Sequence, residues 1–120
     1  MERGGGGRFT DSEVQAYKQD VKNIMIRMGL LSGEEVHTVQ QKNVTRAEYL
    51  EAETDGLWYP VFSAGDTFAG GEVLGTVRDI WGNLLREYRA DYPGIVLYQT
   101  VGLGVKTGDP LIAYGEYVDR

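Results

Sequence analysis

The residues able to do chemistry in this 120-residue chain are few and widely spaced. His37 is the only histidine and cysteine is absent, which excludes a disulfide framework and a cysteine-based zinc site. Because no second histidine accompanies it, we expect His37 to be a solvated loop residue. Ser12, Ser32 and Ser63 have no histidine partner besides His37 and no nucleophile-elbow motif. The sequence therefore predicts neither a metal site nor a serine nucleophile within the chain.

Two aspartates follow glycines, in Gly65-Asp66 and Gly108-Asp109. Aspartate in a glycine turn commonly accepts a hydrogen bond from the nearby backbone, and we expect that role here in preference to a catalytic carboxylate pair. The glycines at 4–7 lack the lysine and hydroxyl residue of a phosphate-binding loop. The sequence therefore predicts turns at these glycines and no phosphate site.

Composition narrows the class of protein. The net charge of −6 argues against nucleic acid as a partner, since phosphate binding needs a basic face. No apolar run reaches the length of a membrane span, and no signal-peptide pattern is present, so we expect no membrane partner and a cytoplasmic location. With 42% hydrophobic residues the chain can build a core, and its length fits one domain with an appended element.

Residues 10–31 are expected to form an amphipathic helix and its stop. Thr10 and Glu13 have the spacing of a capping box, and Gly29 suits the left-handed position after the last turn. The apolar residues recur at the spacing of one helical face: Val14, Tyr17, Val21, Ile24, Met25 and Met28. The polar residues 32–43 then predict a linker, and the alternation in 44–53 predicts a strand that opens a β domain over 44–118.

Residues 55–114 read as one short β unit written twice. Each copy has a glycine, an apolar run, a glycine turn, a second glycine turn and another apolar run. The aligned copies match Gly56 with Gly94, Leu57 with Ile95, Gly70 with Gly108, Val73 with Leu111 and Leu74 with Ile112. Two such copies predict interlocking half-sheets related by a pseudo-twofold axis.

This duplication resembles the biotinyl/lipoyl-like barrel-sandwich hybrid fold. The expected fold class is thus mainly β, with two quasi-repeated halves preceded by one amphipathic helix. In carriers of that fold a modified lysine projects from the hairpin that joins the halves. The equivalent residues 77–82 contain no lysine, and Lys42 and Lys106 lie elsewhere. Arginine is not an acylatable amine, so a carrier function is disfavoured.

A narrower resemblance comes from the order of short motifs along nearly the whole chain. They are Glu-x-Gly-Gly from Glu2, Met-Gly-Leu-Leu from Met28, Asp-Gly-Leu-Trp-Tyr-Pro-Val from Asp55, Gly-Asp at 65, Gly-Gly-Glu-Val-Leu-Gly from Gly70, Arg-Asp-x-x-Gly-Asn from Arg78, Pro-Gly-Ile-Val-Leu from Pro93 and Thr-Gly-Asp-Pro-Leu from Thr107. In this order the chain resembles the C-terminal region of the succinylglutamate desuccinylase/aspartoacylase family of zinc-dependent deacylases.

The resemblance implies a parent enzyme that hydrolyses the amide bond of an N-acyl amino acid or a similar N-acyl amine. In this family two histidines and a glutamate hold zinc, and a second glutamate on a Glu-x-Gly motif acts on the zinc-bound water. Glu2 matches that general base. No His-x-x-Glu motif is present. The resemblance therefore implies zinc in the parent and none in this chain, with residues 1–9 as the end of an upstream catalytic domain.

The same resemblance implies that the β domain shapes or shields the active-site entrance. The apolar face of the helix would pack on the catalytic domain, which predicts an exposed apolar patch in this chain, or one covered by self-association into a homo-oligomer. The alternative is a free-standing, non-catalytic binding module that uses Trp58, Tyr59 and Trp81 as a contact surface.

Overall fold

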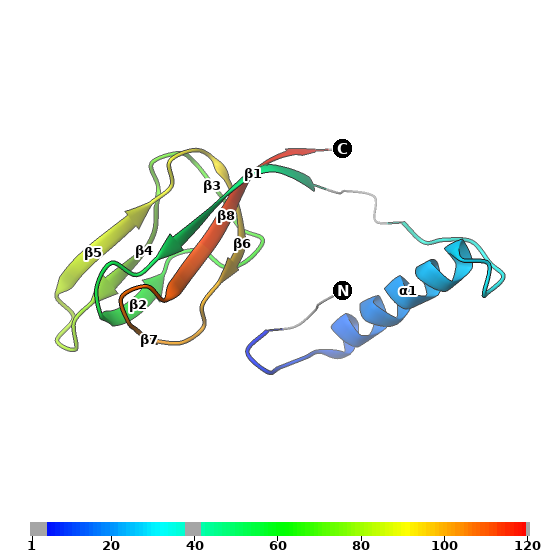
Figure 1. Ribbon diagram of the computed structural model, residues 1–120, viewed down its shortest axis with the longest axis horizontal. Coiled ribbons are helices and arrows are strands. Elements are labelled where there is room, and N and C mark those ends of the chain that lie inside the picture. Colours follow the sequence, from blue (N-terminus) through cyan, green and yellow to red (C-terminus); the bar gives the residue numbers. More distant parts are fainter. Residues whose placement is uncertain (1–4, 38–41, 120) are drawn as a thin grey trace. The chain divides into compact units, whose positions relative to one another are not determined.

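The computed structural model describes residues 5–37 and 42–119 of the chain. The chain divides into two compact units, residues 1–39 and 40–120. The elements labelled in Figure 1 are α1 (Asp11–Arg27), β1 (Lys42–Glu51), β2 (Gly56–Pro60), β3 (Thr67–Phe68), β4 (Val73–Arg78), β5 (Leu84–Arg89), β6 (Gly94–Gln99), β7 (Gly104–Val105) and β8 (Pro110–Asp119). Across the described residues, no helix is both long and apolar enough to pass through a membrane.

The first unit is built on α1, whose two ends are capped as the sequence predicts. The backbone N–H of Thr10 donates to the Glu13 carboxylate at 2.6 Å, and the Glu13 N–H donates to the Thr10 hydroxyl at 3.3 Å. Gly29 ends the helix with a φ of 71°, a conformation that residues with a Cβ rarely adopt. The predicted helix over 10–28 is therefore confirmed to within one residue at each end.

The apolar stripe of α1 is present and exposed. The helix buries none of its 17 residues. Ile24 is 48% exposed and Met28, at the C-cap, is 66% exposed. The predicted exposed apolar patch is therefore confirmed, although the capped helix folds without burying it.

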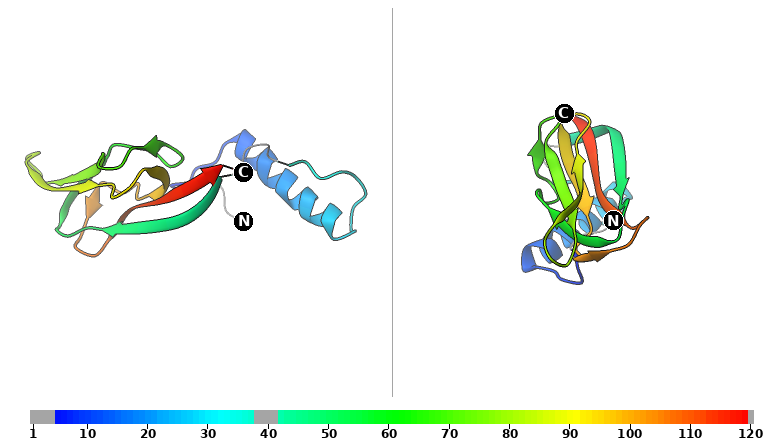
Figure 2. Two further views of the ribbon diagram at one scale, coloured as in Figure 1. Left: turned by 90° about the horizontal axis from the view of Figure 1, so that it is seen from above. Right: turned by 90° about the vertical axis from the view of Figure 1, so that its left-hand side faces the viewer.

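The second unit consists of two antiparallel four-stranded sheets, in the orders β1-β8-β6-β3 and β5-β4-β2-β7. The two orders match strand by strand, with β1 in the place of β5, β8 in that of β4, β6 in that of β2 and β3 in that of β7. Matched strands are always four apart in sequence. Strands β1–β4 and β5–β8 are thus two copies of one unit, and each sheet takes two strands from each copy. Figure 2 shows the longest strands, β1 and β8, side by side, one from each copy. The predicted interlocking of two half-sheets is confirmed.

The duplication is longer than the sequence alignment indicated, and part of it has a different register. Gly56 and Gly94 occupy equivalent positions at the starts of β2 and β6, as expected. Trp58 in β2 and Val96 in β6 are then also equivalent. Trp58 lies opposite Val77 of β4, and Val96 lies opposite Tyr114 of β8, so Val77 and Tyr114 are equivalent. The expected matches of Gly70 with Gly108, Val73 with Leu111 and Leu74 with Ile112 are therefore wrong by one residue. The correct partners are Gly71 with Gly108, Leu74 with Leu111 and Val77 with Tyr114.

Burial explains the corrected register. Leu74, Val77, Leu111 and Tyr114 are all fully buried, and a shift of one residue would turn a strand's side chains to the opposite face. The edge strands β1 and β5 also correspond to each other, because β1 pairs with β8 as β5 pairs with β4. The strand expected at 44–53 lies at Lys42–Glu51, two residues earlier at each end.

Candidate functional site

The expected catalytic residue, Glu2, lies outside the described residues. Among residues 5–37 and 42–119, no group of three or more histidine, cysteine, aspartate or glutamate side chains is arranged to hold a metal ion. His37 Nε2 lies 3.5 Å from a Glu35 carboxylate oxygen, which makes two candidate ligands at that place. A zinc ion commonly needs three protein ligands, so this part of the chain does not fit one.

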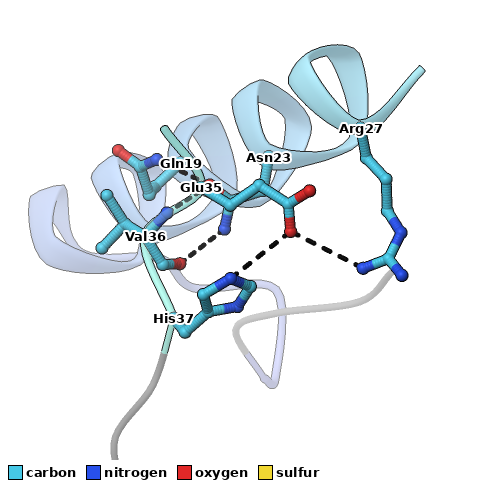
Figure 3. A network of polar contacts seen from close by, with 6 residues as sticks. All are labelled: Gln19, Asn23, Arg27, Glu35, Val36 and His37. Carbon is cyan, nitrogen blue, oxygen red and sulfur yellow. Dashed lines mark hydrogen bonds and ion pairs between the residues drawn. The ribbon is translucent and has the colours of Figure 1, made fainter. Parts of the chain in front are cut away.

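His37 belongs instead to a polar network that ties residues 35–37 to α1 (Figure 3). The Asn23 amide donates to the Val36 carbonyl at 2.7 Å, and its oxygen accepts from the Val36 N–H at 3.0 Å. The Gln19 amide donates to the same Asn23 oxygen at 3.0 Å. One side chain thus satisfies both polar backbone groups of Val36, as a neighbouring strand would.

Two further contacts of the Glu35 side chain flank this one in Figure 3. The Glu35 carboxylate lies 3.6 Å from the Arg27 guanidinium and 3.5 Å from His37. Within the linker expected over 32–43, residues 35–37 are therefore held against α1 by Asn23 and Arg27, and residues 38–41 lie outside the described part. Nothing in the pattern of 32–43 marks this docking, because the bonding groups are backbone atoms. The His37 side chain is exposed, as expected of a loop histidine.

Both aspartates of the glycine turns act as the sequence predicts. Asp66 accepts the Ser63 N–H, and Asp109 accepts the Lys106 N–H, each at 2.8 Å. They are not equivalent in the duplication, since Glu72 occupies the place of Asp109 and accepts the Ala69 N–H at 2.6 Å. The carboxylates are engaged in local turns, and this arrangement favours no catalytic pair.

The β4–β5 hairpin joins the two copies and presents two large side chains to solvent. Asp79 accepts the N–H groups of Trp81 and Asn83, each at 2.8 Å. Its pKa is lowered, first by the hydrogen bond from the Asn83 side chain, because these donors stabilise the ionised form. Ile80 is 76% exposed and Trp81 82% exposed at the tip. A carrier lysine is absent from this hairpin, while Lys42 lies in β1 and Lys106 follows β7.

The three aromatic residues expected to form a contact surface do not act together. Trp58 is 2% exposed, and its ring lies edge-on to that of Tyr88 at 5.7 Å between centroids. Tyr59 is 43% exposed. The prediction for Trp58 is wrong because Gly75, on the neighbouring strand β4, has no side chain and leaves room for the indole. Only Tyr59 and Trp81 remain available for a contact.

No protein-family model matches the chain, and neither does any curated protein. Solved structures do match. The ectoine utilization protein EutE (DoeB) from Ruegeria pomeroyi, in a product-bound structure, is 29% identical with a TM-score of 0.81; the match covers 94% of this chain and 36% of that protein. A succinylglutamate desuccinylase from Silicibacter sp. TM1040 is 25% identical with a TM-score of 0.82, over 96% of this chain and 36% of that one.

A third match shows the fold alone. It is to a succinylglutamate desuccinylase/aspartoacylase from Rhodobacter sphaeroides, at 24% identity and a TM-score of 0.78, over 93% of this chain and 37% of that one. The chain spans little more than a third of the length of each of these three proteins.

Proposed function

With the chain recognised as the C-terminal region of the succinylglutamate desuccinylase/aspartoacylase family, we propose that it is the non-catalytic part of a deacylase acting on N-acyl amino acids or related N-acyl amines. The reaction is hydrolysis of an amide bond, in which water attacks the acyl carbon and the amine leaves with a proton. In the parent, a zinc ion would polarise that water, and the ligands of the zinc would be residues other than 5–37 and 42–119 of this chain. A cytoplasmic location is part of the same proposal.

The exposed apolar face of α1 is the observation that carries this proposal. Helix caps and dipole charges define where α1 begins and ends, but most helical stability in proteins comes from packing an apolar face. Here Tyr17, Ile24 and Met28 are each at least 40% exposed. A groove of about 260 Å³, lined by Phe9, Glu13, Val14, Tyr17 and Lys18, adds a concave surface to this unit. Such a face suits a neighbouring domain of the same protein.

For the β unit we propose the barrel-sandwich hybrid class and a role in shaping or shielding the entrance to the active site. Two sheets that exchange strands between two copies support the class. The hairpin tip supports the role, because Asp79 holds the backbone that presents the exposed apolar side chains of Ile80 and Trp81, and a backbone ordered in advance lowers the entropy cost of a contact.

The test is to express the full reading frame that encodes this chain and assay hydrolysis of N-acetyl-aspartate and N-succinyl-glutamate, with and without a zinc chelator. We expect chelator-sensitive turnover. An Ile80→Ser/Trp81→Ser variant should keep its zinc content and change selectivity between the two substrates. A frame with no His-x-x-Glu motif and no turnover would overturn the deacylase, and unchanged selectivity in the variant would overturn the shielding role.

The exposure of Trp81 also favours the second candidate, a free-standing binding module. In that case the reading frame would begin near Met1 and its product would hydrolyse neither substrate. Trp81→Ser would then abolish binding of the module to its partner. The same reading frame and assay therefore separate the two candidates.

A further inference from the structure

A groove of about 660 Å³ lies in the β unit at the start of β6, the strand that pairs with β3 on one side and with β8 on the other. Its walls come from three places: β3 with the turn after it, the start of β6, and the part of β8 beyond Gly115. The lining residues are Thr67, Phe68, Ala69, Glu72, Pro93, Gly94, Glu116 and Tyr117. Glu116 and Tyr117 pair with β1, whereas the β6 register with β8 starts at Ile95 and Gly115. The groove thus occupies the place that a longer β6 would fill.

The duplication supplies an internal comparison, because the equivalent place in the other sheet carries a pair of hydrogen bonds. There Asp55 accepts the N–H of Thr107 at 2.8 Å and its hydroxyl at 3.0 Å, which ties the turn before β2 to the turn before β8. The equivalents of Asp55 and Thr107 at the groove are Pro93 and Gly70, which cannot form this clamp. One copy therefore ties its two turns together with these hydrogen bonds, whereas the copy with the groove has no side chains that could form them.

The lining combines an apolar base with two carboxylates. Phe68 is 7% exposed and packs edge-on to Tyr114, so the base is a fixed part of the core. Glu72 lies in the turn after β3 and uses one carboxylate oxygen to accept the Ala69 N–H, while Glu116 lies in β8. No basic residue lines the groove, and within residues 5–37 and 42–119 neither glutamate forms an ion pair.

Two basic residues of β1, Lys42 and Arg46, pack their charged groups against aromatic rings near the groove. Arg46 lies 4.3 Å from the centroid of the Tyr92 ring and pairs with Glu48 at 3.0 Å. The hydrogen bond that Arg46 donates to the Glu48 carboxylate and, to a lesser degree, the charge of Glu116 raise the pKa of Arg46. Lys42 places its ammonium group 3.9 Å from the centroid of Tyr117, a lining residue. The rim of the groove therefore already receives an ammonium ion on a ring face.

We propose that this groove binds a small ligand with a primary ammonium or guanidinium group on a short apolar stem. The stem would lie on Phe68 and Pro93, and the cation would sit between Glu72 and Glu116, where charge-assisted hydrogen bonds are strongest. The lysine side chain, the arginine side chain and aliphatic polyamines share this chemistry. The proposal uses residues of the β unit alone and does not depend on the proposed deacylase activity.

The test is a titration of the ¹⁵N-labelled chain with n-butylammonium chloride, followed through backbone amide resonances. The Ala69 amide is the reporter, because it donates to Glu72. We expect saturable shifts at Ala69 and at residues 116–117, which weaken with added salt. n-Butanol, with the same stem and no charge, should bind at least roughly tenfold more weakly.

Glu116→Gln should weaken binding about tenfold. Glu51→Gln is the matched control: Glu51 ends β1 opposite Pro110, at the far end of β8 from Glu116, and its change should leave binding unchanged. A Gly70→Thr/Pro93→Asp variant transfers the Asp55–Thr107 clamp to the groove and should abolish the shifts. Equal affinity for n-butanol, an unchanged affinity in Glu116→Gln, or shifts scattered over all carboxylates would each overturn the proposal.

Discussion

The indole of Trp58 lies directly against the Cα of Gly75 on the neighbouring strand, and a side-chain carbon at residue 75 would overlap the ring. Trp58 is the largest fully buried side chain of the β unit. The pair explains why a tryptophan that looks suited to ligand stacking is part of the core.

Gly75→Ala is therefore expected to destabilise the β unit by about 2–3 kcal/mol, because an added carbon must displace a packed ring. Gly104→Ala is the matched control, since its new carbon would meet no atom within 4 Å. Urea unfolding monitored by tryptophan fluorescence measures both. Equal stability of the two variants would contradict the packing described for Trp58.

Two buried tyrosine hydroxyls, from the non-equivalent strands β5 and β8, bond to backbone N–H groups that are equivalent in the two copies. The Tyr88 hydroxyl accepts the Glu53 N–H at 2.9 Å, and the Tyr114 hydroxyl accepts the Asp91 N–H at 3.1 Å. Burial raises the pKa of Tyr114. Replacing either tyrosine by phenylalanine leaves a backbone donor unpaired and should cost about 1 kcal/mol of unfolding free energy.

Tyr98→Phe provides the control for both tyrosine variants, because its ring is 43% exposed and its hydroxyl can bond to water. Thermal unfolding of the three variants makes the comparison. A loss in Tyr98→Phe as large as in Tyr88→Phe would contradict the role given to the buried hydroxyl groups.

Asn23 is expected to hold the segment after α1 in place. Asn23→Ala removes both hydrogen bonds to Val36, and exchange of the Val36 amide proton should accelerate roughly fivefold, the equivalent of about 1 kcal/mol. Lys22→Ala, on the same helix, should leave this exchange rate unchanged. If the Val36 amide exchanges equally fast in both variants, the contact does not protect it.

The β4–β5 hairpin is expected to loosen in acid. The folded-state pKa of Asp79 is lowered, so its ionised form stabilises the hairpin above the ordinary aspartate range near pH 4. That contribution is lost as pH falls through the lowered pKa. The Trp81 and Asn83 amide resonances should report this titration, and Asp79→Ala should remove it. Persistence of the titration in Asp79→Ala would assign it to another group.

The sequence by itself determined the features that depend on neighbours along the chain. The capping box of Thr10 and Glu13, the stop at Gly29 and the aspartate turns all follow from local hydrogen bonding and backbone sterics. The repeated glycine and apolar spacing was also enough to predict two interlocking copies.

Only the tertiary structure decided the features that depend on contacts across strands. The docking of Val36 on Asn23 joins residues 13 positions apart, the packing of Trp58 on Gly75 joins residues 17 apart, and the register of β8 places Tyr114 opposite Val96, 18 positions away. The groove likewise lies beside Pro93 and Gly70, the positions equivalent to the hydrogen-bonded pair Asp55 and Thr107 of the other copy. A sequence pattern cannot weigh these alternatives, because each is selected by the shape and polar groups of a partner that is distant in the chain.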